Sequence, residues 1–185
     1  MKILKTNLRG LEVFESKNIF DNRGYFREVF LKKNIKENII FTVVSKSKKN
    51  VLRGLHMQFK KQQGKYISVV KGKILDVCVD CRKNSKTFGK NYKILLSEKN
   101  AKSIFIPPGF IHGFLGLEKE NIVVYGCTNY RDKNSEIGVM WNDTDLKIKW
   151  PIKKPIVSKK DKNNISFEEF KKLKFLKNRK IRNKI

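Results

Sequence analysis

The sequence predicts an all-β domain, either a sandwich or a barrel, from three features of its 185 residues. Hydrophobic residues recur with a period of two rather than 3.6, as expected for strands that bury one face. The apolar runs are short and rich in Val, Ile, Tyr and Phe, which favour strands. Gly, Asn, Lys-Asn or Pro separates one run from the next. Many short strands at this spacing are typical of sandwiches and barrels.

Strand patterns extend along most of the chain. In order, they occupy residues 12–16, 42–47, 65–70, 73–80, 92–97, 103–108 and 122–130. No repeat, linker or low-complexity segment divides them, so we predict one domain over residues 1–165.

Helical patterns are few. Residues 26–38 are compatible with a short helix. A clearer one starts at Ser166, which forms a capping-box pattern with Glu169. Its apolar residues recur every three positions, at Phe167, Phe170, Leu173 and Leu176. The other face is nearly all Lys and Arg, so residues 166–185 are predicted as a basic amphipathic helix and tail. A helix packed on the sheets is the simplest interpretation; a nucleic-acid or membrane patch is the alternative.

The composition is that of a globular protein with unusual charge. It is 39% hydrophobic and 11% aromatic, with a formal net charge of +26. Nucleic acid, an anionic membrane surface and a phosphorylated small molecule are all candidate partners for such a charge. Lys, Asn and Ile are over-used throughout, however, so most of the charge is interpreted as a compositional bias. The basic residues also lack the interleaved aromatics that stacking on nucleic acid requires, which argues against a nucleic-acid partner.

The cysteines and the N-terminus predict a cytoplasmic protein. The start of the chain lacks the apolar core of a signal peptide, and no stretch approaches the length of a membrane span. Three cysteines without an export signal favour a reducing compartment. Cys78 and Cys81 lie in a strand pattern and should point to opposite faces, so we expect buried thiols rather than a zinc or redox pair.

Charged and polar residues interrupt the apolar pattern at three places. Arg23 and Gly24 form a turn, and an arginine there suits phosphate. Arg53 and His56 lie in the apolar stretch "VLRGLHMQ" with opposite strand parity, so a kink at Gly54 is needed to bring both to one side. Lys65 begins the next strand, and the sequence order suggests that it pairs with His56 for proton transfer.

The third place is "IPPGFIHGF", where a Pro-Pro-Gly turn precedes His112. Tyr125 follows within an apolar run, where its hydroxyl needs a hydrogen-bond partner or acts as a proton donor. His56 and His112 are the only histidines of the chain. Metal sites in β-sandwich enzymes generally use several histidines and a carboxylate, so this count argues against a metal site without excluding two His ligands joined by a carboxylate.

Six motifs, in order, resemble one known family. They are "RGLHMQ", "QQGK", "DVCVDCRKNSKTFG", "LSEKNAKSIFIPPGFIHGF", "YGCTNYRD" and "WNDTDLKIKWP". Together they resemble the dTDP-4-dehydrorhamnose 3,5-epimerases, from about Ile19 to Asp161. The resemblance implies a cupin-like jelly roll (a double-stranded β-helix) with a few short peripheral helices, a homodimer, and neither metal nor other cofactor. It also implies nucleotide-sugar chemistry in the synthesis of deoxysugars for surface polysaccharide.

The resemblance assigns four catalytic residues. His56, in "RGLH", matches the general base. Asp161, in "VSKKD", matches the carboxylate that orients it. Lys65, after "QG", matches the residue that stabilises the enolate oxygen. Tyr125 matches the general acid on the opposite face of the sugar.

It also assigns a diphosphate site. Arg23 matches the arginine of "RG-x-F", Arg53 that of "RGLH", and His112 the histidine of "HGF". Phe26 and Glu28 match residues near the nucleotide, and Tyr130 matches an aromatic at the sugar–nucleotide end.

One strand departs from the family pattern. The family commonly has "Q-x-N-x-S" before "RGLH", with Gln and Asn reaching the substrate. Phe41 and Val43 occupy those two places here, and Ser45 remains as a substrate-binding residue. Apolar groups therefore replace two polar contacts.

The sequence thus predicts an isomerase that inverts C-3, C-5 or both of a dTDP-4-keto-6-deoxyhexose. A single-site epimerase, or an isomerase on a differently activated 4-keto sugar, is the alternative that Phe41 and Val43 keep open. A non-enzymatic basic module that binds nucleic acid is the more remote one.

Overall fold

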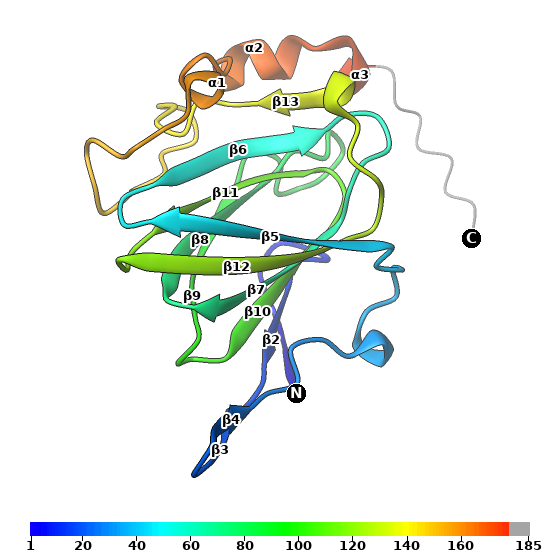
Figure 1. The fold of residues 1–185 in the computed structure, drawn as a ribbon. Coiled ribbons are helices and arrows are strands. Elements are labelled where there is room, and N and C mark those ends of the chain that lie inside the picture. The colour runs from blue at the N-terminus through cyan, green and yellow to red at the C-terminus, as the bar shows by residue number, and fades with distance from the viewer. Residues whose placement is uncertain (178–185) are drawn as a thin grey trace.

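The computed structural model describes residues 1–177, which form two packed antiparallel sheets (Figure 1). The larger sheet has six strands in the order β1-β2-β10-β7-β12-β5, and the smaller has five in the order β13-β6-β11-β8-β9. Strands of the larger sheet are β1 (Lys2–Lys5), β2 (Glu12–Glu15), β5 (Phe41–Lys48), β7 (Lys65–Lys71), β10 (Lys102–Ile106) and β12 (Glu120–Cys127). Strands of the smaller are β6 (Leu52–Gln58), β8 (Lys73–Asp80), β9 (Asn91–Ser97), β11 (Phe110–Gly116) and β13 (Glu136–Gly138).

This arrangement is the predicted jelly roll. Between β5 and β12, chain neighbours mostly lie in opposite sheets; only the β8–β9 pair stays together. Each strand therefore turns one face into the space between the sheets, as the period of two in the sequence requires. The inner face of this sandwich holds a cluster of apolar side chains that includes Ile67, Ile104, Phe114 and Val123.

A second apolar cluster covers the outer face of the smaller sheet. Leu55, Val79 and Ile111 of the sheet pack there against Phe167 and Phe170. Phe167 and Phe170 belong to α2 (Phe167–Lys172), which follows α1 (Lys159–Lys162) and precedes α3 (Lys174–Lys177).

The C-terminal helix begins as predicted but is shorter. Ser166 and Glu169 form the capping box. The helix ends at Leu173, whose backbone is extended (φ −64°, ψ 138°), and a separate turn, α3, follows. Phe170 is fully buried, so the apolar stripe packs on the sheet while the exposed side carries the lysines. Residues 178–185 of the predicted tail lie outside the described residues, and the division of the chain at residue 165 stays a prediction.

The N-terminal region differs from its prediction. Residues 26–38 form a single 3₁₀ turn, η1 (Lys32–Asn34), rather than a helix. Before it, β3 (Ile19–Asp21) and β4 (Gly24–Phe26) make a hairpin that projects from the end of the molecule away from α1 and β13 (Figure 1). Phe20 and Phe26 on this hairpin are 72% and 64% exposed.

The cysteines lie as predicted. Cys78 is in the cluster between the sheets and Cys81 in the outer cluster, so they do point to opposite faces. Both are buried free thiols, as is Cys127. Among residues 1–177, no helix has the length and apolar character needed to cross a membrane.

Candidate active site

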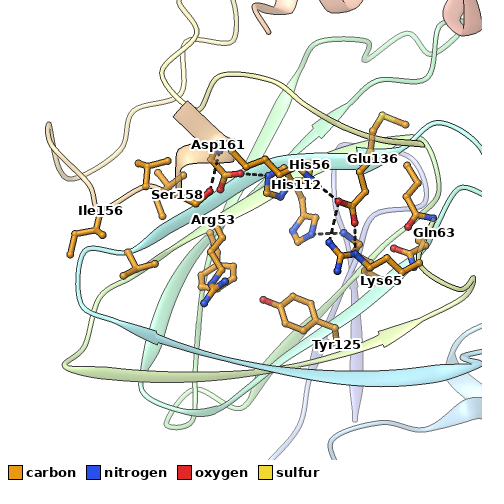
Figure 2. A pocket seen from close by; sticks show the side chains of 18 residues that line it. Arg53, His56, Gln63, Lys65, His112, Tyr125, Glu136, Ile156, Ser158 and Asp161 are labelled. Carbon is orange, nitrogen blue, oxygen red and sulfur yellow. Dashed lines mark hydrogen bonds and ion pairs between the residues drawn. The ribbon is translucent and has the colours of Figure 1, made fainter. Parts of the chain in front are cut away.

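A pocket of about 510 Å³ opens between β7 and β12 of the larger sheet and β6 and β11 of the smaller. Its size is within the usual range for small-molecule sites. Arg53, His56, Lys65, His112, Tyr125 and Asp161, all predicted as site residues, line it (Figure 2). The sandwich is therefore hollow at one side, and polar residues within apolar strands face this hollow.

Two glycines explain how Arg53 and His56 come to share the pocket. Gly54, between them, has φ +128°, which side-chain-bearing residues rarely adopt. A Cβ on Gly54 would lie 2.5 Å from Cα of Gly113 in the neighbouring strand β11, where the register also shifts. The kink predicted at Gly54 is confirmed, and it turns both side chains of opposite parity into the pocket.

His56 is held by Asp161. The His56 Nε2 atom lies 2.6 Å from Oδ1 of Asp161, and Oδ2 accepts a hydrogen bond from the backbone N–H of Gly54 at 3.2 Å. An ionised carboxylate only accepts, so Nε2 carries the proton and Nδ1 is the ring nitrogen that can take one. Burial opposes ionisation of Asp161, but the hydrogen bonds from His56, Gly54 and Ser158 leave its pKa below the ordinary value.

Lys65 pairs with His112 rather than with His56. Lys65 Nζ donates to Nε2 of His112 at 3.1 Å. The strands β6 and β7, although consecutive, belong to different sheets, so His56 and Lys65 reach the pocket from opposite sides and their role as a proton-transfer pair stays a prediction. Burial lowers the pKa of Lys65, and burial together with the Lys65 charge lowers that of His112.

Asp76 lies behind His112. It is fully buried on β8, and its Oδ2 is 3.6 Å from Nδ1 of His112. These two atoms have no hydrogen-bond partner within the described residues. Nε2 of His112 accepts the hydrogen bond from Lys65, so it carries no proton in the neutral ring. The ring proton is therefore on Nδ1, which faces the Asp76 carboxylate. His112 is only 7% exposed, and its contacts place it beside Lys65; its predicted role at the diphosphate stays a prediction.

Tyr125 faces the pocket from the opposite sheet. Its hydroxyl lies 3.0 Å from the Ser45 hydroxyl on the neighbouring strand β5. This contact is the hydrogen-bond partner that a buried tyrosine requires. Burial raises the pKa of Tyr125, so the phenol keeps its proton at neutral pH and is available as a proton donor.

Arg53 lies at one end of the pocket. Its Nε donates to the Ser47 hydroxyl at 2.9 Å, and its guanidinium also donates to the carbonyl oxygen of Lys46 at 3.1 Å. The described contacts join it to no carboxylate, which suits a residue that binds an anionic ligand.

An ion-pair cluster at the pocket rim escaped sequence analysis. Glu136 of β13 accepts from Nε of Arg131 and from Nζ of Lys160, both at 2.5 Å. Arg131 and then Lys160 hold the pKa of Glu136 at about 2 despite partial burial. The Lys160 contact also ties α1, and with it the neighbouring Asp161, to β13 across the pocket.

Five predicted site residues are outside the lining of this pocket: Arg23, Phe26, Glu28, Ser45 and Tyr130. Arg23, Phe26 and Glu28 belong to the projecting hairpin and its continuation. The described contacts of the Arg23 side chain go to Asp21, at 2.6 Å. Tyr130 lies beside the pocket rather than in its lining and stacks on Phe41.

Three residues at the site were not predicted from the sequence, and only one of them had a sequence pattern that could have revealed it. Asp76 had one, because a carboxylate within the apolar run "KILDVCVD" is seldom buried without a role. Glu136 and Arg131 had none, since their pairing depends on how β13 joins the edge of the smaller sheet. Residues 1–177 contain no group of three or more His, Cys, Asp or Glu placed to hold a metal ion.

Comparison with known proteins identifies the family. The family model described as dTDP-4-dehydrorhamnose 3,5-epimerase matches residues 5–169. The chain belongs to this family.

Relatives support the assignment over nearly the whole chain. A dTDP-4-dehydrorhamnose 3,5-epimerase of Methanothermobacter thermautotrophicus is 42% identical over 170 residues, covering 88% of this chain and 92% of the relative. The crystal structure of a dTDP-6-deoxy-D-glucose-3,5-epimerase from Legionella pneumophila, in complex with dTDP-4-keto-L-rhamnose, is 36% identical with a TM-score of 0.86. It covers 90% of this chain and 93% of that one.

A 3'-monoepimerase from Streptomyces bikiniensis, in complex with dTDP, is also similar. It is 26% identical with a TM-score of 0.84, covering 89% of this chain and 87% of that one. The protein described here is thus an epimerase, an enzyme of the isomerase class, on the family's jelly-roll fold.

The Glu136 cluster predicts a pH-dependent contribution to stability. Glu136→Gln should lower the free energy of unfolding at pH 7 by roughly 1–2 kcal/mol, because two charge-assisted contacts are weakened. The pKa falls from an ordinary 4.5 to about 2 on folding, so acid protonates the unfolded chain first. The difference between wild type and variant should be full above pH 4.5 and vanish as pH falls through about 2.

Urea denaturation across this pH range measures the effect. Glu37→Gln, at an exposed position before β5, is the matched control and should change stability little at any pH. A Glu136→Gln deficit that stays constant from neutral to strongly acidic pH would contradict the assignment.

Proposed function

We propose that the enzyme inverts C-3 and C-5 of a dTDP-4-keto-6-deoxyhexose by proton abstraction and reprotonation, in synthesis of dTDP-L-rhamnose type sugars. One observation carries the proposal: the His56–Asp161 pair and the Tyr125 hydroxyl come from opposite sheets and line one pocket with Lys65 (Figure 2). Inversion at a carbon needs a base on one face and an acid on the other, and this pocket offers both.

The first step removes a proton from a carbon beside the ketone. His56 Nδ1 takes this proton, the C–H bond breaks, and its electron pair moves through the carbon skeleton onto the ketone oxygen. Asp161 fixes the tautomer that leaves Nδ1 as the base and stabilises the imidazolium that forms. Lys65, with neutral His112 beside it, supplies donors for the enolate oxygen.

The second step returns a proton from the other face. Tyr125 donates its phenolic proton to the enolate carbon, and the electron pair returns from oxygen to form the new C–H bond. Ser45, hydrogen-bonded to Tyr125, holds the phenol in place. A positioned acid or base of this kind contributes roughly 10²–10⁴-fold to the rate.

The alternative is a single-site epimerase. Val43 lies directly opposite Tyr125 in the β5–β12 register, so an apolar group borders the proposed acid where the family commonly has Asn. That change and the similarity to a 3'-monoepimerase are the two observations that favour the single-site alternative.

Deuterium exchange tests the function. Incubation with dTDP-4-keto-6-deoxyglucose in deuterated water, followed by NMR, should show incorporation at both C-3 and C-5. His56→Ala should abolish exchange at both carbons because the base is gone. Incorporation at one carbon would select the single-site alternative, and exchange at the wild-type rate in His56→Ala would overturn the assignment.

We further propose that the active enzyme is a homodimer in which the β3–β4 hairpin of one copy completes the pocket of the other. Arg23 and Phe26 resemble substrate-binding residues, yet no residue of the hairpin lines the pocket of its own chain. The hairpin projects from the end of the molecule away from α1 and β13 (Figure 1). Its exposed apolar side chains, Ile19, Phe20 and Phe26, favour burial against a second chain. A symmetric dimer would give each pocket one such hairpin.

Mixing two inactive variants tests this arrangement. His56→Ala lacks the base, and Arg23→Ala lacks the hairpin arginine. Refolded together, they should form mixed dimers in which one pocket has both groups, restoring about a quarter of the wild-type sites if chains pair at random. A mixture with no more activity than its components, or a chain that sediments as a monomer, would contradict the proposal.

We also propose that the enzyme works in the cytoplasm, where sugar nucleotides for surface polysaccharide are made. Its three cysteines are buried and unpaired, which suits a reducing compartment. Recovery of the protein outside the cytosolic fraction of its cells would contradict this placement.

A further inference from the structure

A second cavity lies at one end of the sandwich, where β5 ends and β12 begins (Figure 1). Its volume is about 1090 Å³, and its other walls are the turns between β7 and β8, between β9 and β10, and between β11 and β12. Ile156 lines both this cavity and the active-site pocket, and the two linings have no other residue in common. The cavity is therefore a site of its own, next to the active site.

Lysine dominates the lining of this cavity. Seven of the fourteen lining residues are lysine, whereas lysine makes up about a fifth of the whole chain. The seven come from four separate segments, the end of β5 and the three turns. The fold, rather than one lysine-rich stretch or the composition of the chain, thus gathers the charge at this place.

Carboxylates neutralise only part of this charge. Glu120 lies 2.7 Å from Lys71 and also contacts Lys46, and Glu118 lies 3.3 Å from Lys73. The lining contains three glutamates against its seven lysines. An excess of positive charge therefore remains around the cavity.

The excess belongs to lysines at the ends of the strands. Within the part of the chain that the structure describes, Lys48, Lys49, Lys99 and Lys119 form no ion pair, and all four are exposed. Charges of one sign around a hollow focus the electrostatic potential and concentrate counter-ions there. The lysine ammonium is a compact point charge that suits phosphate groups. The cavity is thus prepared for an anion with several charges.

The remaining lining residues indicate that such an anion is recognised by its charge alone. Besides lysine and glutamate, the lining consists of Ser47, Gly72, Ser97 and Ile156. Among the described residues no aromatic side chain lines the cavity, so a nucleobase has no ring to stack on.

We propose that this cavity is a binding site for linear polyphosphates, the class that includes inorganic tripolyphosphate and the triphosphate group of a nucleotide. A row of adjacent phosphates carries several negative charges, so one ligand contacts lysines from different segments at once. A single phosphate contacts fewer of them and should bind more weakly. The site is independent of the proposed function, because its lysines do not line the active-site pocket.

Calorimetric titration with inorganic tripolyphosphate tests the site. Saturating dTDP is present throughout, so that the active-site pocket is occupied. The wild type should bind one tripolyphosphate per chain, at least tenfold more tightly than inorganic phosphate, and more weakly as the salt concentration rises. Absence of binding, or equal affinity for phosphate and tripolyphosphate, would overturn the proposal.

Charge-changing variants locate the bound tripolyphosphate. Lys99→Gln combined with Lys119→Gln should weaken binding by about tenfold, because two unpaired charges are lost. Glu118→Gln should strengthen binding by about threefold, because it removes a negative charge from the lining, an effect that damage to the fold would not produce. Lys36→Gln combined with Lys86→Gln is the matched control, since both lysines are exposed and lie outside the cavity. It should change the affinity less than twofold.

Two outcomes of this variant series would contradict the site. One is an equal loss of affinity in the cavity variant and in the control variant, which would mean that the net charge of the whole chain decides binding. The other is unchanged or weaker binding in Glu118→Gln.

Two further ligands distinguish the possible sources of the phosphates. ATP should bind no more tightly than tripolyphosphate, because the cavity offers its base no stacking partner. A short oligouridylate should bind more weakly than either, because sugars separate its phosphates. ATP binding tenfold more tightly than tripolyphosphate would make the cavity a nucleoside site, and a tenfold preference for the oligouridylate would make it part of a nucleic-acid surface. Either result would overturn the proposal.

Discussion

The hydrogen bond between the His56 ring and Asp161, 2.6 Å long, joins residues 105 positions apart, and the site depends on it. The segment that carries Asp161 has little regular structure of its own, since α1 is a four-residue turn capped by Ser158. What holds it is a set of contacts with the smaller sheet: the bond to His56, the bond from the Gly54 N–H, and the ion pair between Lys160 and Glu136. The same contacts that dock the segment therefore build the catalytic base.

Placing polar and charged side chains inside an apolar sandwich costs free energy, and contacts among neighbouring polar side chains offset part of this cost. Buried Asp76 and His112 and half-buried Lys65 lie next to one another from β8 through β11 to β7. Unpaired, each would be costly to remove from water; together they keep a neutral imidazole beside a lysine whose pKa burial lowers. Across the pocket, burial raises the pKa of Tyr125 and keeps it protonated, while Ser45 lies within hydrogen-bond distance of its hydroxyl. The two sheets thus place a base and an acid on opposite sides of one pocket that Lys65 also lines.

The residue pattern predicted a β-sandwich or barrel because alternation is local, whereas the jelly roll and the roles of the catalytic residues came from the resemblance to the family. Alternation of apolar residues sets the strands, and glycine at position 54 signalled the kink that turns Arg53 and His56 to one side. Asp161 followed from a motif, and the contact with His56 then appeared in the structure. The pairing of Lys65 with His112 was missed, since sequence order says nothing about which sheet a strand joins. The Glu136 cluster and the Phe41–Tyr130 stack were also missed. Each joins a strand to a segment that has no regular sequence pattern, so the sequence does not show which residues meet there.

The role of Asp161 is the central claim, and its most direct test is the rate of solvent-deuterium incorporation in Asp161→Asn. An asparagine fills the same space but cannot stabilise the imidazolium, and its amide can bond the opposite tautomer of His56. Incorporation should fall by roughly 10²–10⁴-fold, as for loss of a general base, while dTDP binding stays within a few-fold of wild type. Incorporation within threefold of the wild-type rate, at unchanged dTDP affinity, would contradict the account.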